Sequence, residues 1–533
     1  MADVKIERVL VSVYDKTDLV DFVRGLVEMD VEIISTGGTR RLLLESGLEA
    51  LDVSEYTGYP EMMDGRVKTL HPRVHGGLLA MRDNPEHLKA MADNQIKRID
   101  MVVVNLYPFE ATIAKPDVTL GEAIEQIDIG GPSMIRSAAK NHAYVTVVTS
   151  PAQYDRVLDE MKKNGGATTL ETRSEFARVV FKLTSHYDGA IANYLQRQAG
   201  VSEKYPSVLE VGFEKAAELR YGENPHLTAA FYRDASCDEP GVGNAKVIAG
   251  GAMSYNNYLD ADGAYEIVKE FQRPAASVIK HTNPCGAAVA DTLKEAFLRA
   301  YSGDPVSAFG DIIGLNRPLD LETARALLEP ENKPEGVVVK VDIIIAPGFD
   351  PEALQLIRTA HKWGEKTLFL ETGELTGSYG SRGMAMRTVT GGMLVQDRNF
   401  ATWVDADLKV VTRRKPTDRE MKDLYFAWIV GKHVKSNTIL LAKDETVVGV
   451  GAGQMSRVDA AMIAAYKAGE RAKGSVCASD AFFPYPDGVQ KVCEAGATAI
   501  VQPGGSKGDD KAIAMAEKYD VAMIFTGMRH FRH

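Results

Sequence analysis

Residues 277–288 read Ser-Val-Ile-Lys-His-Thr-Asn-Pro-Cys-Gly-Ala-Ala, and the longer, C-terminal part of the chain is organised around this stretch. The apolar run that precedes Lys280 is typical of a strand, and Asn283-Pro284 followed by Gly286 indicates a turn. Strand ends that meet loops are where α/β proteins carry their chemistry. His281 can exchange a proton near neutral pH, and Lys280 offers a positive charge for a developing oxyanion or a phosphate. Taken alone, the pair also fits an ordinary strand end on the surface.

The regions on either side of this stretch, roughly 200–375 and 376–533, both alternate between strand and helix patterns. Helical spacing is found at residues 260–271, 291–300 and 421–430, and an apolar strand at residues 341–347. Alternation of this kind predicts right-handed βαβ units around mostly parallel sheets. No repeat is visible at the level of residues.

The N-terminal third shows the same alternation. Apolar runs at residues 9–13, 31–34, 99–106 and 145–148 are typical of buried parallel strands. Apolar residues recur with helical spacing from Leu19 to Val27, where Asp15 or Thr17 is positioned to cap the helix, and a long amphipathic helix is expected over residues 175–194. Glycine and proline between residues 200 and 206 mark a candidate domain boundary.

Three segments of this third carry candidate chemistry. Residues 35–39, Ser-Thr-Gly-Gly-Thr, lie between a strand and a helix expected from Arg40, an arrangement that suits an anion because glycine exposes main-chain amides at a helix N-terminus. Residues 64–77 form a loop that is dense in cations. Asp128, before two glycines, and Lys140, at the end of the following helix, are expected either to reach one pocket and handle protons or to cap that helix.

The chain has 533 residues, a formal net charge of −11, 45% hydrophobic and 25% charged residues. This composition is typical of a globular protein, and the length favours three to four structural units. The acidic balance argues against nucleic acid or an anionic membrane as a partner, and no apolar run is long enough to span a bilayer. The four cysteines are not spaced as zinc ligands, and their scarcity, with an N-terminus that lacks a signal-peptide profile, predicts a cytoplasmic protein.

Long motifs resemble the PurH family of bifunctional purine biosynthesis enzymes, nearly from end to end of the chain. Residues 12–17, 35–39, 65–72, 105–109, 126–131 and 138–142 resemble the family's IMP cyclohydrolase domain, and the Lys280-His281 segment resembles its AICAR transformylase domain. The resemblance implies an α/β fold: an N-terminal doubly wound parallel-sheet domain like methylglyoxal synthase, and a transformylase region of two α/β subdomains like cytidine deaminase. The expected bounds are 1–199 for the first, and 200–375 and 376–533 for the other two.

The resemblance also implies two consecutive reactions at the end of IMP biosynthesis. A formyl group passes from 10-formyltetrahydrofolate, the folate co-substrate, to the amine of aminoimidazole carboxamide ribonucleotide (AICAR) and gives FAICAR. Ring closure with loss of water then converts FAICAR to IMP. These nucleotides and folate are the expected partners, the protein is expected to be a homodimer, and the sequence requires no metal.

For formyl transfer, the resemblance makes three residues catalytic. His281 is the expected base for the amine, because its reference pKa of about 6.5 is near the working pH. Lys280 is expected to stabilise the formyl oxygen or to protonate the leaving nitrogen, and Asn437 to hold the carboxamide. The expected substrate-binding residues are Arg220, Tyr221, Gly310, Asp342, Arg457, Phe482 and Arg529. Asp311 departs from the bacterial pattern, in which a second glycine is expected near the folate.

For ring closure, the resemblance assigns catalysis to Lys68, Tyr107, Asp128 and Lys140. The expected nucleotide-binding residues are Ser12, Lys16, Ser35, Thr36, Gly37, Gly38, Thr39, Arg66 and Thr69, with the glycine-rich loop and Lys16 on the phosphate.

Two rival classes of function can be weighed against this one. Pro284-Cys285 suggests a zinc deaminase, but such a site needs H-x-E and P-C-x-x-C, and Asn283 and Ala288 stand where ligands would be required. The N-terminal third also resembles methylglyoxal-synthase-type domains that sense ligands, in which case Lys68, Asp128 and Lys140 would only bind.

Overall fold

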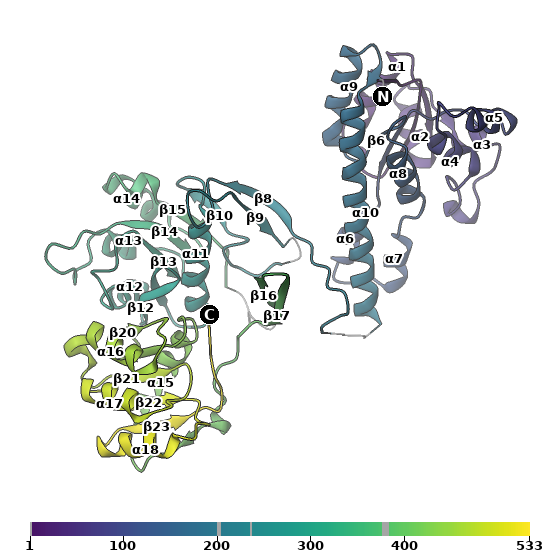
Figure 1. The fold of residues 1–533 in the computed structure, drawn as a ribbon. Coiled ribbons are helices and arrows are strands. Elements are labelled where there is room, and N and C mark those ends of the chain that lie inside the picture. The colour runs from purple at the N-terminus through teal and green to yellow at the C-terminus, as the bar shows by residue number, and fades with distance from the viewer. Residues whose placement is uncertain (1–2, 200–203, 235–236, 376–382) are drawn as a thin grey trace. The chain divides into compact units, whose positions relative to one another are not determined.

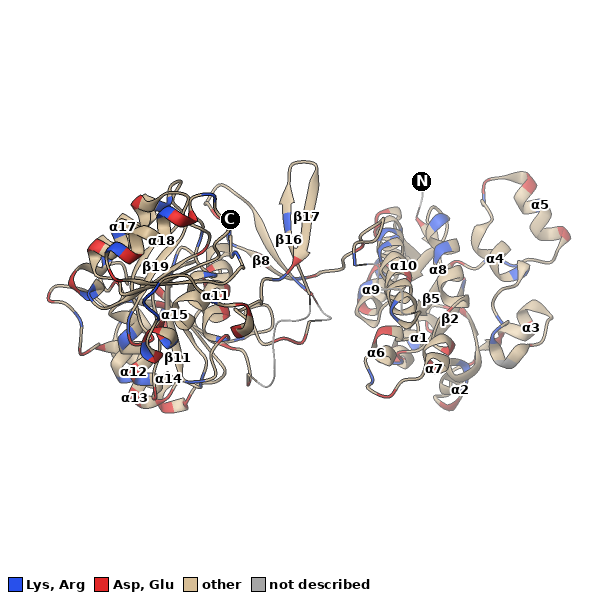
Figure 2. Ribbon diagram, turned by 90° about the horizontal axis from the view of Figure 1, so that it is seen from below, with Lys and Arg blue, Asp and Glu red and all other residues tan. Residues whose placement is uncertain are grey.

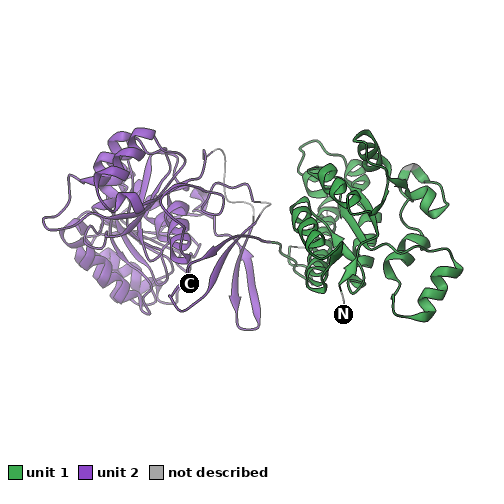
Figure 3. Ribbon diagram, turned by 90° about the horizontal axis from the view of Figure 1, so that it is seen from above, with its two compact units in different colours: residues 1–212 green, residues 213–533 purple. Residues whose placement is uncertain are grey.

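The computed structural model describes residues 3–199, 204–234, 237–375 and 383–533. By its internal contacts the chain divides into two compact units, Met1–Gly212 and Phe213–His533 (Figure 3). The domain boundaries expected at residues 200 and 376 lie in the segments 200–203 and 376–382, which are outside the described part of the chain.

The first unit is built on a five-stranded parallel sheet with strand order β4-β3-β2-β5-β6. Its strands are β2 (Arg8–Val13), β3 (Glu32–Ser35), β4 (Leu51–Asp52), β5 (Met101–Asn105) and β6 (Thr146–Val148). A small antiparallel pair, β1 (Val4–Lys5) with β7 (Ala167–Thr168), lies outside it. The strand order reverses between β2 and β5, which is the point where doubly wound sheets bind ligands at the carboxyl ends of their strands.

Helices cover both faces of this sheet, as the sequence predicted (Figure 1). The core joins the sheet to α1 and α9, where the rings of Phe22 and Tyr154 stack with centroids 4.2 Å apart, and to α4, α8 and α10. The helices are α1 (Leu19–Val27), α2 (Gly37–Glu45), α3 (Val53–Thr57), α4 (Pro72–Leu79), α5 (Pro85–Asp93), α6 (Phe109–Ile113), α7 (Leu120–Glu125), α8 (Gly130–Lys140), α9 (Tyr154–Lys163) and α10 (Leu170–Gln198).

Three local predictions are wrong here. Residues 72–77, expected to lie in the cationic loop, belong to α4, because Pro72 is at the first turn of that helix and His71 caps it. The helix after the glycine-rich loop begins at Gly37 and not at Arg40, because the Arg40 N–H already donates to the Thr36 carbonyl at 3.0 Å and closes the first turn over the two glycines. Neither Asp15 nor Thr17 caps α1: Asp18 holds the N-cap position without a side-chain bond, and Asp15 instead accepts the Thr17 main-chain N–H at 2.9 Å in the preceding turn.

The second unit contains two six-stranded sheets with the same topology. One has the order β10-β15-β14-β13-β11-β12 and the other β18-β23-β22-β21-β19-β20. The strands of the first are β10 (Lys246–Ala249), β11 (Ala275–Lys280), β12 (Asn283–Val289), β13 (Asp311–Leu315), β14 (Val341–Ala346) and β15 (Leu368–Glu371). Those of the second are β18 (Lys409–Val410), β19 (Ile439–Ala442), β20 (Val447–Gly451), β21 (Val476–Ser479), β22 (Ala499–Gln502) and β23 (Ala522–Phe525).

The helices repeat in the same places of the two sheets. The first set is α11 (Tyr255–Val268), α12 (Leu293–Tyr301), α13 (Leu321–Leu328) and α14 (Pro351–Ala360), and the second is α15 (Asp418–Gly431), α16 (Arg457–Ala468), α17 (Pro486–Ala495) and α18 (Asp509–Lys518). Even the hairpin turns correspond, since Lys280 and Lys443 both precede two residues with positive φ. The chain therefore carries a structural repeat that is not visible in its residues.

One hydrophobic core joins the two sheets. It contains α11 and α15 together with one face of each sheet, and the rings of Phe271 and Phe426 lie 5.5 Å apart within it. The sheets also touch at their edges, where the Val289 N–H donates to the Glu445 carbonyl at 3.0 Å. The two halves of this unit are thus packed as one body.

Two antiparallel hairpins complete the second unit, β8 (Glu214–Leu219) with β9 (Ala229–Arg233), and β16 (Met384–Val389) with β17 (Gly392–Asp397). Figure 2 shows acidic and basic residues side by side on helices such as α17 and α18. Among the described residues, every helix is too short or too polar to cross a bilayer.

Candidate functional site

The residues predicted around the glycine-rich loop meet at the carboxyl ends of β2 and β3. The hydroxyls of Ser12 and Thr36 are 3.1 Å apart, and the Thr39 hydroxyl bonds the main chain of Val13. Ser35 is fully buried and donates to the Val11 carbonyl at 2.9 Å. Ser35 therefore fixes the strand, whereas the other three hydroxyls lie at the start of α2.

Gly37 and Gly38 open α2 without a side chain, and Gly37 has φ +41°. The Lys68 Nζ atom lies 3.1 Å from where a Cβ at Gly37 would be, and it pairs with Glu61 at 2.6 Å. The cationic loop thus delivers an ammonium to the N-terminus of a helix. A helix N-terminus with an adjacent lysine is suited to a phosphate or a carboxylate.

The N-terminus of α8 borders the same place. Thr69 Oγ1 lies 2.7 Å from where a Cβ at Gly130 would be, and Asp128 Oδ1 accepts the Gly131 N–H at 2.8 Å. Burial raises the pKa of the Asp128 carboxyl, and this hydrogen bond opposes the shift. Burial, followed by the negative charges of Asp128 and Glu61, raises the pKa of the Tyr107 hydroxyl. Lys68, Thr69, Tyr107 and Asp128 are therefore brought together.

Among the described residues, three other predicted residues form no hydrogen bond or ion pair with the cluster of Lys68, Thr69, Tyr107 and Asp128. Lys16 turns back to the Val13 carbonyl at 2.8 Å, and its partial burial lowers its pKa. Arg66 is exposed and forms an ion pair with Glu125. Lys140 is exposed at the last residue of α8, about 15 Å along the helix axis from its first residue. Within one chain, the arrangement of Asp128 and Lys140 is that of charges at opposite helix ends.

In the second unit, Lys280 ends β11 and His281 begins the hairpin turn with φ 57°. The Lys280 ammonium donates to the carbonyls of Ser307 and Phe309 at 3.2 and 3.0 Å. Asp260 of α11 accepts the Thr282 N–H at 2.6 Å and so fixes the turn from the other face of the sheet. The two candidate catalytic residues are adjacent in sequence. The loop before β13 holds Lys280, and α11 holds the turn that contains His281.

Asn437 is held by its surroundings. Its amide nitrogen donates to the carbonyls of Gln454 and Met455 at 2.9 and 3.2 Å, and its oxygen accepts from Arg457 at 2.7 Å. Arg457 is buried and pairs with the fully buried Asp480 at 2.6 Å. Arg457 therefore positions Asn437 and has few donors left for a ligand.

The remaining predicted residues fall into two places. Phe482 follows Asp480 by two residues, and Arg529 precedes His530, whose N–H donates to the Asp480 carbonyl at 2.9 Å. Gly310, with φ +69°, and Asp342 lie together beside the Lys280 loop. Among the described residues, no hydrogen bond or ion pair connects Arg220 or Tyr221 to the other predicted residues; the Arg220 guanidinium lies over the Tyr221 ring, 5.9 Å from its centroid.

The two clusters of predicted residues in this unit are linked. The Lys435 N–H donates to the Asn283 side chain at 3.1 Å, so the turn after Lys280 is joined to the segment that carries Asn437. Sequence reasoning missed Asp480, Asp260 and Glu61, which act through these residues. Their roles become visible only through contacts with residues that are distant in the sequence, and the spacing of residues along the chain does not indicate such contacts.

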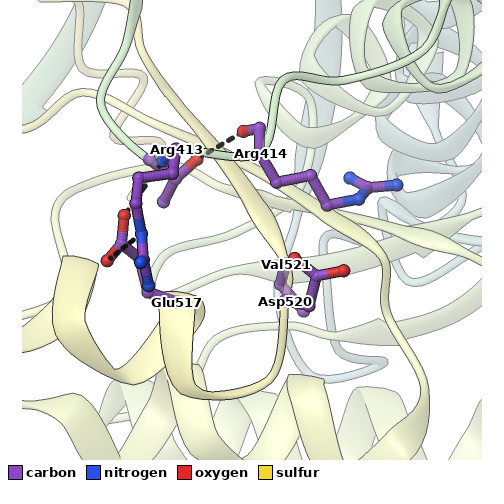
Figure 4. A pocket seen from close by; sticks show the side chains of 6 residues that line it. Arg413, Arg414, Glu517, Asp520 and Val521 are labelled. Carbon is purple, nitrogen blue, oxygen red and sulfur yellow. Dashed lines mark hydrogen bonds and ion pairs between the residues drawn. The ribbon is translucent and has the colours of Figure 1, made fainter.

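A hollow of about 400 Å³ lies elsewhere, between β18 and the end of α18 (Figure 4). Arg413 and Arg414 line it, but Arg413 pairs with Glu517 at 3.1 Å and Arg414 with Glu420 at 2.7 Å. It contains no predicted residue. The part of the chain that is described holds no group of three or more His, Cys, Asp or Glu side chains arranged to bind a metal.

Comparison with known proteins agrees with this layout. Residues 18–133 match the model of the MGS-like domain, and residues 138–467 match that of the AICARFT/IMPCHase bienzyme. Proteins named bifunctional purine biosynthesis protein PurH from Bacillus cereus and Bacillus anthracis are 50% and 51% identical over 527 residues, which is 99% of this chain and 100% of theirs. A solved structure described as "Crystal structure of ForH" is 34% identical and covers 35% of this chain and 95% of its own, with a TM-score of 0.33.

A parallel-sheet domain with a helix N-terminus suited to an anion, followed by a duplicated α/β unit with its own cluster of polar residues, is the layout of an enzyme with two candidate sites. The chain belongs to the AICARFT/IMPCHase bienzyme family, that of the bifunctional purine biosynthesis proteins PurH.

Proposed function

We propose that the chain transfers a formyl group to AICAR in its second unit and closes the ring of the product FAICAR to IMP in its first. The main support is the sequence identity to a relative named bifunctional purine biosynthesis protein PurH. The two sequences are 50% identical over 99% of this chain and 100% of the relative. The co-substrate of the first step is 10-formyltetrahydrofolate.

In formyl transfer, His281 takes the proton of the AICAR amine and Lys280 stabilises the charge that develops on the formyl oxygen. Asn437 holds the carboxamide with the free lone pair of its oxygen, since Arg457 and two carbonyls occupy its other positions. Arg220 and Arg529 hold the phosphate as planar donors. Holding both substrates in contact contributes much of the acceleration.

In ring closure, the carboxamide nitrogen attacks the formyl carbon of the same molecule. Asp128 and Tyr107 move protons; burial raises the pKa of the Asp128 carboxyl from its ordinary acidic range, which makes it a better base, and keeps the Tyr107 hydroxyl protonated as a hydrogen-bond donor. The α2 N-terminus with Lys68 binds the phosphate or the carboxamide oxygen. Lys140 stays a prediction from the family resemblance, because one chain does not bring it to Asp128.

The active form is proposed to be a homodimer. The hairpin β16–β17 exposes Val389, Met393 and Leu394 by 47%, 45% and 60%, and a two-stranded hairpin is marginally stable alone in water. A second copy that covers these side chains would stabilise the hairpin. Light scattering on Leu394→Asp should then give a larger fraction of monomer, and an unchanged mass would count against this interface.

The protein is proposed to act in the cytoplasm. Its cysteines 237, 285, 477 and 493 are all free thiols, and two of them are buried. Free thiols are typical of a reducing compartment.

The test separates the two reactions. Wild type, Lys280→Ala and Asp128→Asn are assayed once with AICAR and the folate, and once with FAICAR supplied directly. Lys280→Ala should lose at least ~100-fold in transfer and keep ring closure, and Asp128→Asn should do the reverse. Lys443→Ala is the matched control. Lys443 stands directly before the equivalent hairpin turn of the second sheet, so this variant should keep both activities.

Two outcomes would contradict the proposal. Loss of both activities in a folded Lys280→Ala protein would refute the division into two sites. Ring closure that no substitution at Lys68, Tyr107 or Asp128 affects would make the first unit a ligand sensor. Lys140→Ala is assayed beside them, and a loss of ring closure there would require a partner chain to supply that ammonium.

A further inference from the structure

Asp311 is a buried carboxyl that faces Lys280 across the first sheet of the second unit. Strands β11 and β13 are antiparallel, with Ala276 opposite Leu315 and Ile279 opposite Ile312. One step further, the same register sets Lys280 opposite Asp311. Opposed residues of an antiparallel pair have their Cβ atoms about 5 Å apart on the same face of the sheet.

This carboxyl lacks the partners that a buried carboxyl normally has. Asp311 is 3% exposed, and its Oδ1 atom has no hydrogen-bond partner in the part of the chain that the structure describes. Among the described residues it takes part in no ion pair. The Lys280 ammonium is occupied by the carbonyls of Ser307 and Phe309, on the loop that leads into Asp311. The hydroxyl of Tyr301, on α12, is also buried without a partner.

The other charges around Asp311 are already paired. Asp304 binds Lys467 at 2.6 Å, and Asp342 binds Lys340 at 2.7 Å. The titratable and charged groups that face Asp311 from every neighbouring element are Lys280 on β11, Cys285 on β12, Tyr301 on α12, Asp304 with Lys467, and Asp342 with Lys340. Lys280 is thus the only one of these cations without a carboxylate of its own.

We propose that Asp311 is a positioning residue for formyl transfer: as a neutral carboxyl it leaves the Lys280 ammonium free to turn to the substrate, and as a carboxylate it holds that ammonium at the sheet. The inference rests on the proposed function, because it concerns the group assigned there to the formyl oxygen. It makes the loop between α12 and β13 a control point for that group.

Electrostatics supports the geometry. Burial raises the pKa of the Asp311 carboxyl to about 8, the nearby Lys280 charge works against the shift, and the charges of Asp342 and Asp304 add to it. The carboxyl is then neutral at pH 7 and ionised at pH 9. An ion pair with Lys280 forms only in the alkaline range, in a site where water screens it little.

The test is the pH profile of kcat/KM for formyl transfer between pH 6 and 9.5, because kcat/KM reports groups of the free enzyme. Wild type should fall about tenfold for each pH unit above about 8, which is the behaviour of a single ionisation. Asp311→Asn should keep its rate through pH 9. Asp304→Asn is the matched control, since that carboxylate is paired to Lys467; the fall with pH should persist in it, moved to a lower pH because the Asp304 charge no longer adds to the Asp311 pKa.

Asp311→Leu is a second variant that also removes the titrating group, in case the asparagine variant does not fold. Ring closure of supplied FAICAR, measured on the same samples, should have the same pH profile in all variants. If the variants fall with pH as wild type does, the inference is refuted while formyl transfer stands. If wild type transfers no formyl group at any pH, the proposed function itself fails.

Discussion

Replacing Arg457 by methionine should destabilise the second unit strongly. The guanidinium is almost fully buried and donates to the Asp480 carboxylate at 2.6 Å, the Ser479 hydroxyl at 2.8 Å and the Asn437 side chain at 2.7 Å. Asp480 would keep its bonds from Ser436 and Thr438 but lose Arg457, the cation that pairs with it among the described residues. Removing one partner of a buried ion pair costs about 3–5 kcal/mol.

That cost can be expressed as a melting temperature. An unfolding entropy of about 2.1 cal/mol/K per residue gives roughly 0.7 kcal/mol/K for a unit of this size, so Tm should fall by about 6 °C. Calorimetry of the full-length protein would show the transition of the second unit moving and that of the first staying. Formyl transfer should fall as well, because Asn437 loses the donor that orients its oxygen.

The matched control is Arg413→Met. Its guanidinium is 85% exposed and pairs with Glu517, and surface pairs contribute about 0–1 kcal/mol. Equal shifts in the two variants would refute the argument from burial. Adding Asp480→Asn to Arg457→Met should recover part of the lost stability, because the unpaired charge is then gone.

Three further predictions follow from particular contacts. Asp260→Ala should lower formyl transfer at least ~10-fold without changing ring closure, since the turn that presents His281 loses its acceptor, and assays of both reactions would show it. The Asp311 pKa of about 8 in the folded chain lies above the unfolded value of 3.8, so between these values the folded chain binds one more proton than the unfolded chain. The free energy of unfolding of the wild type therefore falls as pH rises through this range. Relative to wild type, Asp311→Asn should become more stable by about 1.4 kcal/mol per pH unit from pH 5 to 7, measured by thermal unfolding. Gly286→Ala should lower Tm sharply, because its Cβ would lie 1.9 Å from a main-chain oxygen of α12, whereas Gly251→Ala, with open space around it, should leave Tm nearly unchanged.

The sequence predicted the strands and the long helices well. Apolar runs such as 99–106 are typical of buried strands of a parallel sheet, and β5 lies within that range. The α/β class and the doubly wound first unit are confirmed. The repeat in the second unit was missed, because the two halves share only the frame: His281-Thr282 in one turn corresponds to Asp444-Glu445 in the other.

The candidate site was predictable only in part. A strand followed by Ser-Thr-Gly-Gly-Thr implies a helix N-terminus open to an anion, and Gly37 opens α2 there. The family resemblance makes Arg457 a ligand for substrate, and the fold adds that Arg457 is buried against Asp480 and donates to the Asn437 oxygen. Such roles depend on contacts between residues far apart in the chain, and one sequence does not contain them.

The core shared by α11 and α15 makes the halves of the second unit interdependent. Ending the chain at residue 375 would leave one face of the first sheet, with Ile343, Ile345 and Leu370, open to water where Leu424, Phe426 and Trp428 now pack. Each half expressed alone should aggregate, and the two expressed together as separate chains should rescue each other's solubility. A gene cut between residues 376 and 383 would therefore yield a working split protein only when both fragments meet as they fold.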